Sequence, residues 1–462
     1  MKNASNTPNA ETKKRLATLV ERAKALDAIF ACGGEVELDA PLTLRGPAGK
    51  KQEIVERISY RSGNVDRKLR AWCTPASFGK GTKTRTDVVV REGRQLYARN
   101  GALAVEGFDK ALRDILCQIR ESLCPHETAP PSAVLHSLNV YGRGGHFVAH
   151  KDTPREPSVF GTLVVCLPLE FRGGRLIVEQ GSRATFDWET LFHSGSSTDK
   201  EARRIRWAAF FGDVNHRIET VTEGCRATLT YELRRAPGAE AVAPGKPGES
   251  EAAFMAALVE SLADPKFVSN GGKFGLPCLH LYAVPTLGRT LPEFENLLNH
   301  MKGRDRLVTA ALQRAGLMPG VVPYIFETCV GESWRLSRNA SARERKIFEQ
   351  KRLKGSSLEQ KLPFEFHSGD HNPDDVTWLI RPPWISAYPE PADGRPEPEV
   401  ELLGEPEYSA TDYFGNEASY AAFYAAAAII FDVPKSSARG RVRENGEVPH
   451  ASLSRRSRQK KG

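Results

Sequence analysis

Short apolar runs separated by turn residues dominate the middle of the chain. Each run has the length of a strand, and Gly, Pro or charged residues separate it from the next. This spacing is typical of an all-β sandwich or barrel. Gly144-Gly145 and Gly173-Gly174 fall where turns are required. We therefore predict a β core domain over residues 131–235, built on the runs AVLHSLNVY, GTLVVCLPL, GRLIVEQ, RWAAFFGDV and ATLTYEL.

Apolar residues at helical spacing precede this region. Residues 11–31 repeat Leu, Val and Ala at helical intervals, and Gly33-Gly34 follow as a helix stop. A second helix is expected over residues 105–123, directly before the first core strand. Because the outer face of a core sheet needs a cover, we expect residues 1–130 to form a helical and mixed segment that buttresses the core.

The second half of the chain mixes both periodicities. Residues 236–251, rich in Pro, Gly and Ala, indicate a linker. Residues 252–434 are then expected to form a C-terminal α+β domain, either a cover for the core or a degenerate second barrel. Its helical segments lie around residues 252–263, 291–317 and 341–360, and its apolar runs lie near 276–284, 321–330 and 376–381.

The charge of the chain is concentrated at one end. The net charge is +8, and residues 435–462 carry nine Lys or Arg and two Glu, so the rest of the chain is close to neutral. We expect this segment to be a basic, disordered tail, either simply solvated or used as a nuclear signal or for an anionic partner. Outside this tail the sequence shows no strong nucleic-acid signal.

No apolar run reaches transmembrane length, and residues 1–12 are polar. We therefore expect a soluble intracellular protein, cytoplasmic or nuclear. The eight cysteines are scattered without CxxC pairs in a chain too large to need a disulfide framework, so we expect them to be reduced.

The candidate chemistry begins with His150 and Asp152. On an extended strand, residues i and i+2 project from one face about 6.6 Å apart, close enough to share one small cation. His216 is the best third ligand, and two histidines with one carboxylate can hold non-heme Fe(II) while positions stay open for co-substrate and O₂. A strand-surface hydrogen-bonded pair is the alternative, because about 1.4 His-x-acid triplets are expected by chance from 11 His and 57 acidic residues in 462.

A predicted hairpin connects this triplet to an arginine. Residues 207–221 are interpreted as one strand, Glu223-Gly224 as the turn and residues 226–233 as the returning strand. With residue 216 opposite 230 and residue 220 opposite 226, His216 and Arg226 would share one face and one pocket. The separation of roughly 13 Å suits an Arg side chain plus a five-carbon diacid such as 2-oxoglutarate. A solvated strand arginine remains the alternative.

Taken together, the stretches LNVYGRGGHFVAHKDTPR, GTLVVCLPLEFRGGRLIVE and GDVNHRIETVTEGCRATLTYEL resemble the prolyl-4-hydroxylase-type Fe(II)/2-oxoglutarate dioxygenases, most closely their large fungal-type branch. The resemblance covers most of the chain, with strong motifs only between about residues 135 and 235. It implies a double-stranded β-helix (jelly roll) in which His150, Asp152 and His216 bind iron and Arg226 binds 2-oxoglutarate. It also places Tyr141 near the co-substrate, although a strand-core tyrosine with a satisfied hydroxyl is the alternative.

The resemblance further implies Fe(II), 2-oxoglutarate and O₂ as cofactors, with ascorbate as a candidate reductant, and release of succinate and CO₂. The expected reaction is hydroxylation of a protein side chain, with proline as one candidate, or of a small molecule. The alternative is a non-catalytic metal- or 2-oxoglutarate-binding sensor or interaction module. His146 and His193 lack partners at ligand spacing and are left out of the metal site. His367 and His371 are not expected to form a second one.

Overall fold

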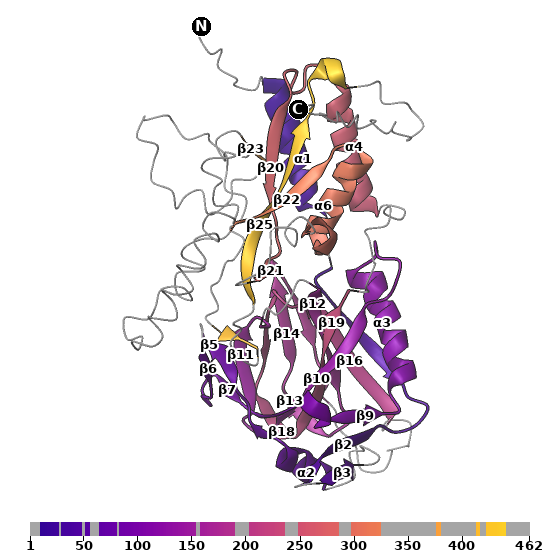
Figure 1. Cartoon of the computed structure of the whole chain (residues 1–462), viewed down its shortest axis with the longest axis vertical. Helices are drawn as coiled ribbons and strands as arrows, with labels where there is room; N and C mark the ends of the chain where they lie inside the picture. Colours follow the sequence, from indigo (N-terminus) through magenta and orange to yellow (C-terminus); the bar gives the residue numbers. More distant parts are fainter. Residues whose placement is uncertain are drawn as a thin grey trace, which may run out of the picture.

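The computed structural model describes residues 10–26, 29–48, 51–55, 64–80, 83–153, 158–189, 203–235, 248–285, 297–324, 376–379, 413–415 and 422–439. Strands outnumber helices, and the helices lie beside the sheets (Figure 1), which confirms the prediction of a mainly β fold with flanking helices. Among the described residues, no helix is both long and apolar enough to cross a membrane.

The largest sheet has seven strands in the order β1-β16-β12-β19-β10-β8-β4, and the pairs along it are antiparallel. Its central strands correspond to the apolar runs of the sequence, and they are buried along most of their length. The strands are β1 (Ala31–Glu37), β4 (Thr74–Pro75), β8 (Arg94–Tyr97), β10 (Ser132–Tyr141), β12 (Val159–Cys166), β16 (Arg204–Phe211) and β19 (Arg226–Arg234).

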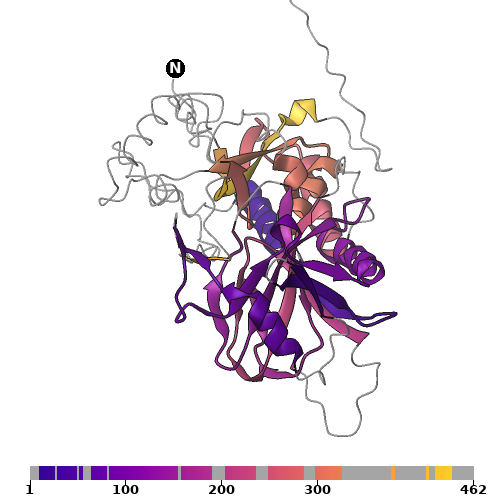
Figure 2. The same cartoon turned by 60° about the horizontal axis from the view of Figure 1, so that its bottom comes forward.

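A second sheet has five strands in the order β15-β14-β17-β11-β7. Its residues Phe147 and Val178 belong to the same hydrophobic core as Leu138 and Trp207 of the first sheet, so the two sheets enclose one core. Smaller sheets lie beside them (Figure 2). The strands of the five-stranded sheet are β7 (Arg91–Glu92), β11 (His146–His150), β14 (Leu176–Gln180), β15 (Ser182–Phe186) and β17 (Asn215–Ile218). One smaller sheet pairs β13 (Phe171–Gly173) with β18 (Val221–Gly224). Another has β2 (Thr43–Ala48) between β3 (Lys51–Val55) and β9 (Ala104–Glu106).

Two short helices complete this core. Helix α3 (Asp109–Leu123) contacts β1, and its buried Ile115 and Ile119 join the sheet residues. Its position agrees with the helix predicted over residues 105–123. Helix α2 (Val65–Trp72) packs near β2. Gly173 and Gly174 have φ of +70° and +66°, a backbone conformation that favours glycine, in agreement with their predicted turn.

A second hydrophobic core lies beyond the end of these sheets (Figure 1), and the elements that form it, with the short segments that join them, are called here the second core. It includes Leu19 and Val20 of α1 (Ala10–Lys24), and α1 packs on α4 (Glu249–Ala263). The segment 1–130 therefore contributes α3 to the first core and α1 to the second. Further elements are α6 (Gly303–Arg314), the strands β20 (Gly272–Pro277), β21 (Tyr282–Pro285), β22 (Pro319–Tyr324), β23 (Val376–Trp378) and β25 (Ala422–Val433), and the 3-10 helices η1 (Arg99–Gly101), η3 (Leu297–His300) and η7 (Ser436–Ala438).

The helix predicted over residues 291–317 is observed as η3 and α6, separated by Met301 and Lys302. Several predictions concern residues outside the described ranges. They are the helix expected at 341–360, the pair His367 and His371, and most of the linker and of the tail.

Residues 413–415 return to the first core. Strand β24 (Tyr413–Phe414) pairs with β5 (Phe78–Lys80), which also pairs with β6 (Lys83–Arg85). The backbone N–H of Gly415 then donates to the carbonyl of Lys151 over 2.8 Å. A segment distant in sequence thus lies directly beside the predicted metal ligands.

The hairpin predicted over residues 207–233 is wrong. Strand β16 ends at Phe211, and residues 212–214 carry the chain into the other sheet, where His216 pairs with His150 and Val178. Strand β19 returns to the first sheet, between β10 and β12, so residues 216 and 230 are not opposite each other. Both β17 and β19 thereby gain hydrogen-bonding neighbours on two sides, whereas an isolated hairpin would leave each with an open edge.

The seven cysteines among the described residues carry free thiols, and five of them are buried. This agrees with the expectation that they are reduced; Cys329 lies outside the described residues.

Candidate metal centre

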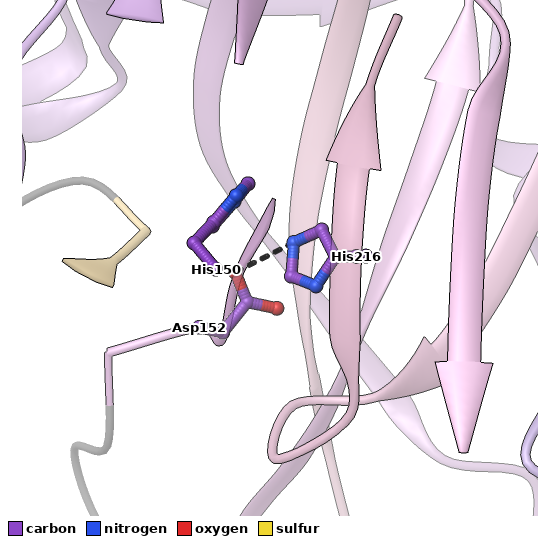
Figure 3. A group of neighbouring side chains, drawn as sticks. All are labelled: His150, Asp152 and His216. Atoms are coloured by element: carbon purple, nitrogen blue, oxygen red, sulfur yellow. Dashed lines mark ion pairs between the residues drawn. The ribbon is translucent and has the colours of Figure 1, made fainter. Parts of the chain in front are cut away.

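Three predicted ligands meet at one end of the first core. His150 ends β11, Asp152 follows it, and His216 lies opposite His150 on β17. Their candidate ligand atoms lie within 4.8 Å of one another, which is close enough to hold one metal ion. His216 Nε2 is 3.7 Å from Asp152 Oδ1, and the two imidazole centroids are 4.1 Å apart (Figure 3). The neighbouring strand pair, and not a hairpin, brings the distal histidine to the other two residues.

Both histidines are oriented by the same local contact. Nδ1 of His150 lies 2.8 Å from the carbonyl of Val148, and Nδ1 of His216 lies 3.0 Å from the carbonyl of Val214. A carbonyl can only accept, so each Nδ1 carries a proton and each Nε2 is the ring nitrogen left to face a metal ion. Metal-binding histidines are typically held in this way, with the other ring nitrogen donating to a carbonyl or carboxylate.

Asp152 is held by two groups that leave one carboxylate oxygen available. The hydroxyl of Thr162 donates a hydrogen bond to Oδ2, and the backbone N–H of Asp152 donates to the carbonyl of Gly212 over 2.9 Å. Oδ1, the oxygen nearer His216, is thereby directed towards the two imidazoles. The pair of contacts sets the carboxylate in a geometry suited to a cation.

Burial keeps His150 in the neutral form that can bind a metal ion. His150 is 3% exposed and His216 is 7% exposed, and the ring of Phe147 stacks on His150 at 3.5 Å between centroids. Burial, helped by neighbouring His216 and Arg91, holds the pKa of His150 well below its ordinary value. His150 is therefore neutral at physiological pH, and a neutral imidazole is the form that coordinates metals.

The predicted clamp residue Arg226 is fully buried. It is opposite Tyr141 in the β10–β19 pair, and its exposure is 0%. None of its three guanidinium nitrogens has a hydrogen-bond partner among the described residues. The rings of Trp188 and Tyr141 lie 5.5 and 5.9 Å from its central carbon, and burial lowers its pKa. A buried cation without a counter-charge is costly, so this position is chemically suited to an anionic ligand.

A continuous set of side chains connects Arg226 with the metal residues. The hydroxyl of Tyr141 accepts a hydrogen bond from Arg91 over 3.3 Å, and the guanidinium of Arg91 lies 4.5 Å from the ring centroid of Phe147. Phe147 in turn stacks on His150. Arg91 also donates to Asn139 over 2.8 Å. Arg226 and the metal residues, which are carried by opposite sheets, are therefore linked by successive side-chain contacts through the core.

A cavity lies beside Asp152. Its wall combines strands of the first core with Ala283 of β21 and Tyr424 of β25, so elements from both parts of the chain border it. The lining residues are His136, Asp152, Thr153, Val159, Gly161, Thr162, Gly212, Thr230, Tyr231, Glu232, Ala283 and Tyr424.

Sequence reasoning missed several residues of this site. Arg91, Thr162 and Trp188 carry no local motif and come from separate strands or loops, so nothing in the linear pattern identified them. The exclusion of His146 agrees with the structure, because carbonyls of Gly144 and Val89 lie 3.0 Å from its two ring nitrogens. His193 lies outside the described residues.

No model of a known protein family and no curated protein matches this chain. Among solved structures, a Pseudomonas putida prolyl-4-hydroxylase is 15% identical over 48% of this chain and 99% of its own, with a TM-score of 0.28. A Trichoplax adhaerens prolyl hydroxylase, solved with a hypoxia-inducible-factor peptide, is 11% identical over 50% and 96%, with a TM-score of 0.24. A Burkholderia pseudomallei protein of the 2OG-Fe(II) oxygenase family is 11% identical over 49% and 81%, with a TM-score of 0.22. Values this low do not establish a common family.

Proposed function

We propose that this protein is an Fe(II)- and 2-oxoglutarate-dependent dioxygenase. The observation that carries the proposal is the combination of a two-histidine, one-carboxylate cluster with a fully buried arginine whose guanidinium has no hydrogen-bond partner among the described residues. Either feature alone would suit several kinds of protein. Together they supply a site for a divalent metal and a site for the distal carboxylate of a diacid within one interior.

The strand order supports a double-stranded β-helix. When β10, β11, β12, β14, β15, β16, β17 and β19 are numbered one to eight, the first sheet has the order 6-3-8-1 and the second has 5-4-7-2. Successive strands thus alternate between the sheets, except for the hairpin of strands four and five in the second sheet, as in a jelly roll. In this interpretation, His150 and Asp152 belong to the second strand and its end, and His216 to the seventh.

The donor set fits Fe(II). Two imidazoles and one carboxylate on one side of a cation leave coordination positions open opposite them, which is the arrangement of non-heme Fe(II) oxygenases. His150 and His216 would bind through Nε2, because each Nδ1 is held by a carbonyl. Asp152 would bind through Oδ1, because Thr162 holds Oδ2.

Arg226 fits the distal carboxylate of 2-oxoglutarate. Its planar guanidinium can donate two parallel hydrogen bonds to a carboxylate, and a charged acceptor would replace the hydrogen bonds that its nitrogens lack among the described residues. Tyr141, held by Arg91, would border the same ligand. Gly174 helps to make room, since a Cβ there would lie 2.9 Å from Cδ of Arg226.

When bound, iron with 2-oxoglutarate and O₂ supplies the oxidative chemistry, with succinate and CO₂ as products. The protein's own contribution is to orient the three ligands, neutralise the diacid at Arg226 and exclude water with Phe147, Trp188 and Phe210. A substrate would reach the centre through the cavity beside Asp152. We infer hydroxylation of a protein side chain, with proline as one candidate, or of a small molecule.

The proposal is tested by succinate release. Protein supplied with Fe(II), ascorbate and 2-oxoglutarate should form succinate above a protein-free blank, and Asp152→Ala should abolish it. His146→Ala is the matched control, since His146 lies on the same strand but outside the ligand set, and it should retain turnover. Metal and 2-oxoglutarate binding without succinate would favour the sensor alternative. A search for products 16 Da heavier, comparing wild type with His150→Ala, would identify the substrate.

A further inference from the structure

A three-residue loop, residues 212–214, holds two of the proposed metal ligands. The carbonyl of Gly212 accepts the backbone N–H of Asp152 over 2.9 Å, and the carbonyl of Val214 accepts Nδ1–H of His216 over 3.0 Å. The loop is also tied to the sheet, because the N–H of Gly212 donates to Phe160 over 3.1 Å. Displacement of this loop would therefore move a carboxylate and an imidazole together.

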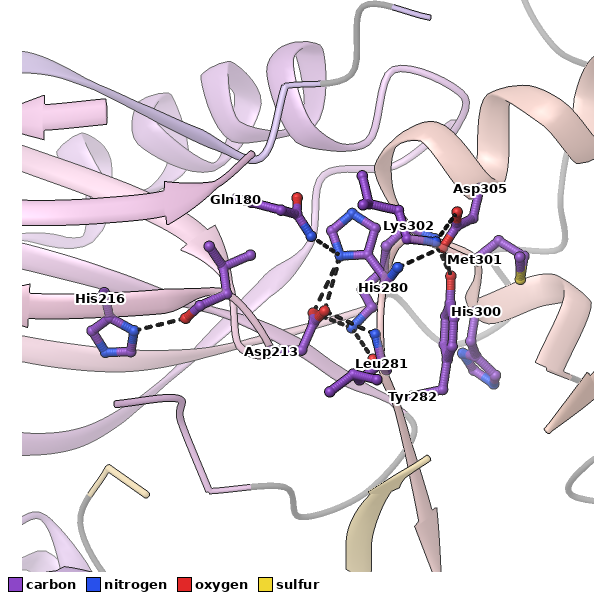
Figure 4. A network of polar contacts seen from close by, with 12 residues as sticks. Gln180, Asp213, His216, His280, Leu281, Tyr282, His300, Met301, Lys302 and Asp305 are labelled. Carbon is purple, nitrogen blue, oxygen red and sulfur yellow. Dashed lines mark hydrogen bonds and ion pairs between the residues drawn. The ribbon is translucent and has the colours of Figure 1, made fainter. Parts of the chain in front are cut away.

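Asp213, the central residue of the loop, points away from His216 and towards His280 and Lys302 (Figure 4). The residue is 4% exposed, and its carboxylate accepts hydrogen bonds from Lys302 Nζ over 2.5 Å, from the backbone N–H of Leu281 over 2.9 Å and from His280 Nδ1 over 3.1 Å. All three donors belong to the segments that begin β21 and α6. Three donors from the second core thus hold a loop of the first core.

The residues that donate to Asp213 are themselves held by further hydrogen bonds. Lys302 Nζ also donates to the carbonyl of Leu281 over 2.7 Å, which joins the two segments. Asp305 accepts the backbone N–H of His280 over 2.9 Å and the hydroxyl of Tyr282 over 2.9 Å. Nε2 of Gln180, on β14, lies 3.2 Å from Nδ1 of His280. The network is therefore a fixed arrangement, and a shift of one member is opposed by several hydrogen bonds.

The charge on Asp213 is maintained despite its burial. Burial by itself would raise the pKa of Asp213, but the charge of Lys302 and the contacts with His280 outweigh it and hold the pKa well below its ordinary value. A buried carboxylate that is compensated in this way is strongly held, since removing either partner leaves an uncompensated charge.

We propose that Asp213 is a positioning residue through which the second core fixes the 212–214 loop and so sets the metal affinity of the centre. The inference rests on the proposed function, because it requires that His150, Asp152 and His216 bind a metal. It assigns to the second core a part in assembling the metal centre. Residues that orient metal ligands commonly change affinity about 10- to 100-fold when they are removed.

The test is a Co(II) titration of the full chain, followed by the ligand-field absorption of the bound ion. Asp213→Asn should weaken Co(II) binding about 10- to 100-fold and alter the absorption spectrum, because the loop no longer holds His216 and Asp152 in place. Glu251→Gln is the matched control. Glu251 is also buried and paired with a cation, Arg314, but this pair joins α4 to α6, which are both elements of the second core. Glu251→Gln should lower the unfolding midpoint and leave Co(II) affinity within about two-fold of wild type.

A second pair of variants keeps the test decisive if Asp213→Asn does not fold. His280→Ala removes one donor and leaves the Lys302 contact, so it should weaken Co(II) binding in the same direction but less. His280→Asn can place an amide donor where Nδ1 lies and should restore affinity. Wild-type affinity and spectrum in a folded Asp213→Asn or His280→Ala, or an equal loss of affinity in Glu251→Gln, would overturn the inference. Failure of wild type itself to bind Co(II), or His150→Ala binding as well as wild type, would instead contradict the proposed function.

Discussion

Replacing Arg226 by methionine should have opposite effects on the free protein and on its ligand complex. The side chain is fully buried, and its three nitrogens have no hydrogen-bond partner among the described residues. Methionine keeps most of the apolar stem and removes the charge. Since replacing poorly compensated buried charges by apolar groups of similar size stabilises proteins by about 1 to 4 kcal/mol, the free energy of unfolding of the ligand-free variant should rise within that range.

The stabilisation by bound ligand should fall. For wild type, 2-oxoglutarate at about 100 times its Kd adds about 2.7 kcal/mol to the free energy of unfolding. Loss of one partner of a buried hydrogen-bonded charge pair costs about 2 to 5 kcal/mol, which raises the Kd by about 30-fold or more. At the same ligand concentration, the stabilisation of Arg226→Met should then be below about 1 kcal/mol.

Urea unfolding measures both effects in three conditions: without metal, with Mn(II), and with Mn(II) plus 2-oxoglutarate. Arg206→Met is the matched control, because Arg206 lies in the same sheet but is paired with Glu35 over 2.9 Å; it should keep the full ligand effect. If 2-oxoglutarate stabilises Arg226→Met as much as wild type, Arg226 does not bind the diacid. A ligand-free variant less stable than wild type would refute the view that the buried charge is uncompensated.

Three further predictions concern single contacts. Thr162→Val removes the hydroxyl that holds Asp152 and should weaken Co(II) binding about 10-fold in a titration, with little change in secondary structure by circular dichroism; unchanged affinity would contradict this role. Gly174→Ala, at φ of +66° and against the buried guanidinium, should raise the Kd for 2-oxoglutarate more than that for Mn(II), which calorimetry can separate. Burial, with nearby arginine charges, lowers the pKa of His126 and of His300 from 6.5 to about 4. As the pH falls, these two histidines therefore take up protons in the unfolded chain before they do so in the folded protein. The free energy of unfolding should then fall as the pH drops from about 6.5 towards 4. Urea midpoints at pH 7, 6 and 5 would test this, and a pH-independent midpoint would contradict it.

The sequence predicted the parts of this site that depend on local geometry. His150 and Asp152 are two residues apart at the end of a strand, so their proximity follows from the strand repeat. The proximity of His216 to these two residues was also predicted, but its strand pairing was not. The chain changes sheets at residues 212–214, and no periodicity in the sequence marks the change, because β16 and β17 are both strands with buried residues.

Contacts between distant segments were not predictable for a related reason. Asp213 and Lys302 are 89 residues apart, and each has the composition of a solvated charge when considered alone. Arg91 similarly reaches Asn139 and Tyr141 from a separate strand. A charged residue that is buried in a network can be recognised only when its partner is known, which requires the fold.

The position of Gly415 has a consequence for the order of events during synthesis. Its carbonyl accepts Arg91 from 324 residues earlier in the chain, and a Cβ at this position would lie 3.1 Å from Oδ1 of Asp152. The ribosome adds about 5 to 20 residues per second, so Gly415 is made roughly 200 residues, or about 10 to 40 s, after His216. All three proposed metal ligands are thus made before the segment beside Asp152 exists. We expect the nascent chain to pass through a stage in which a metal ion can enter from that open side, and synthesis of the segment to narrow that route.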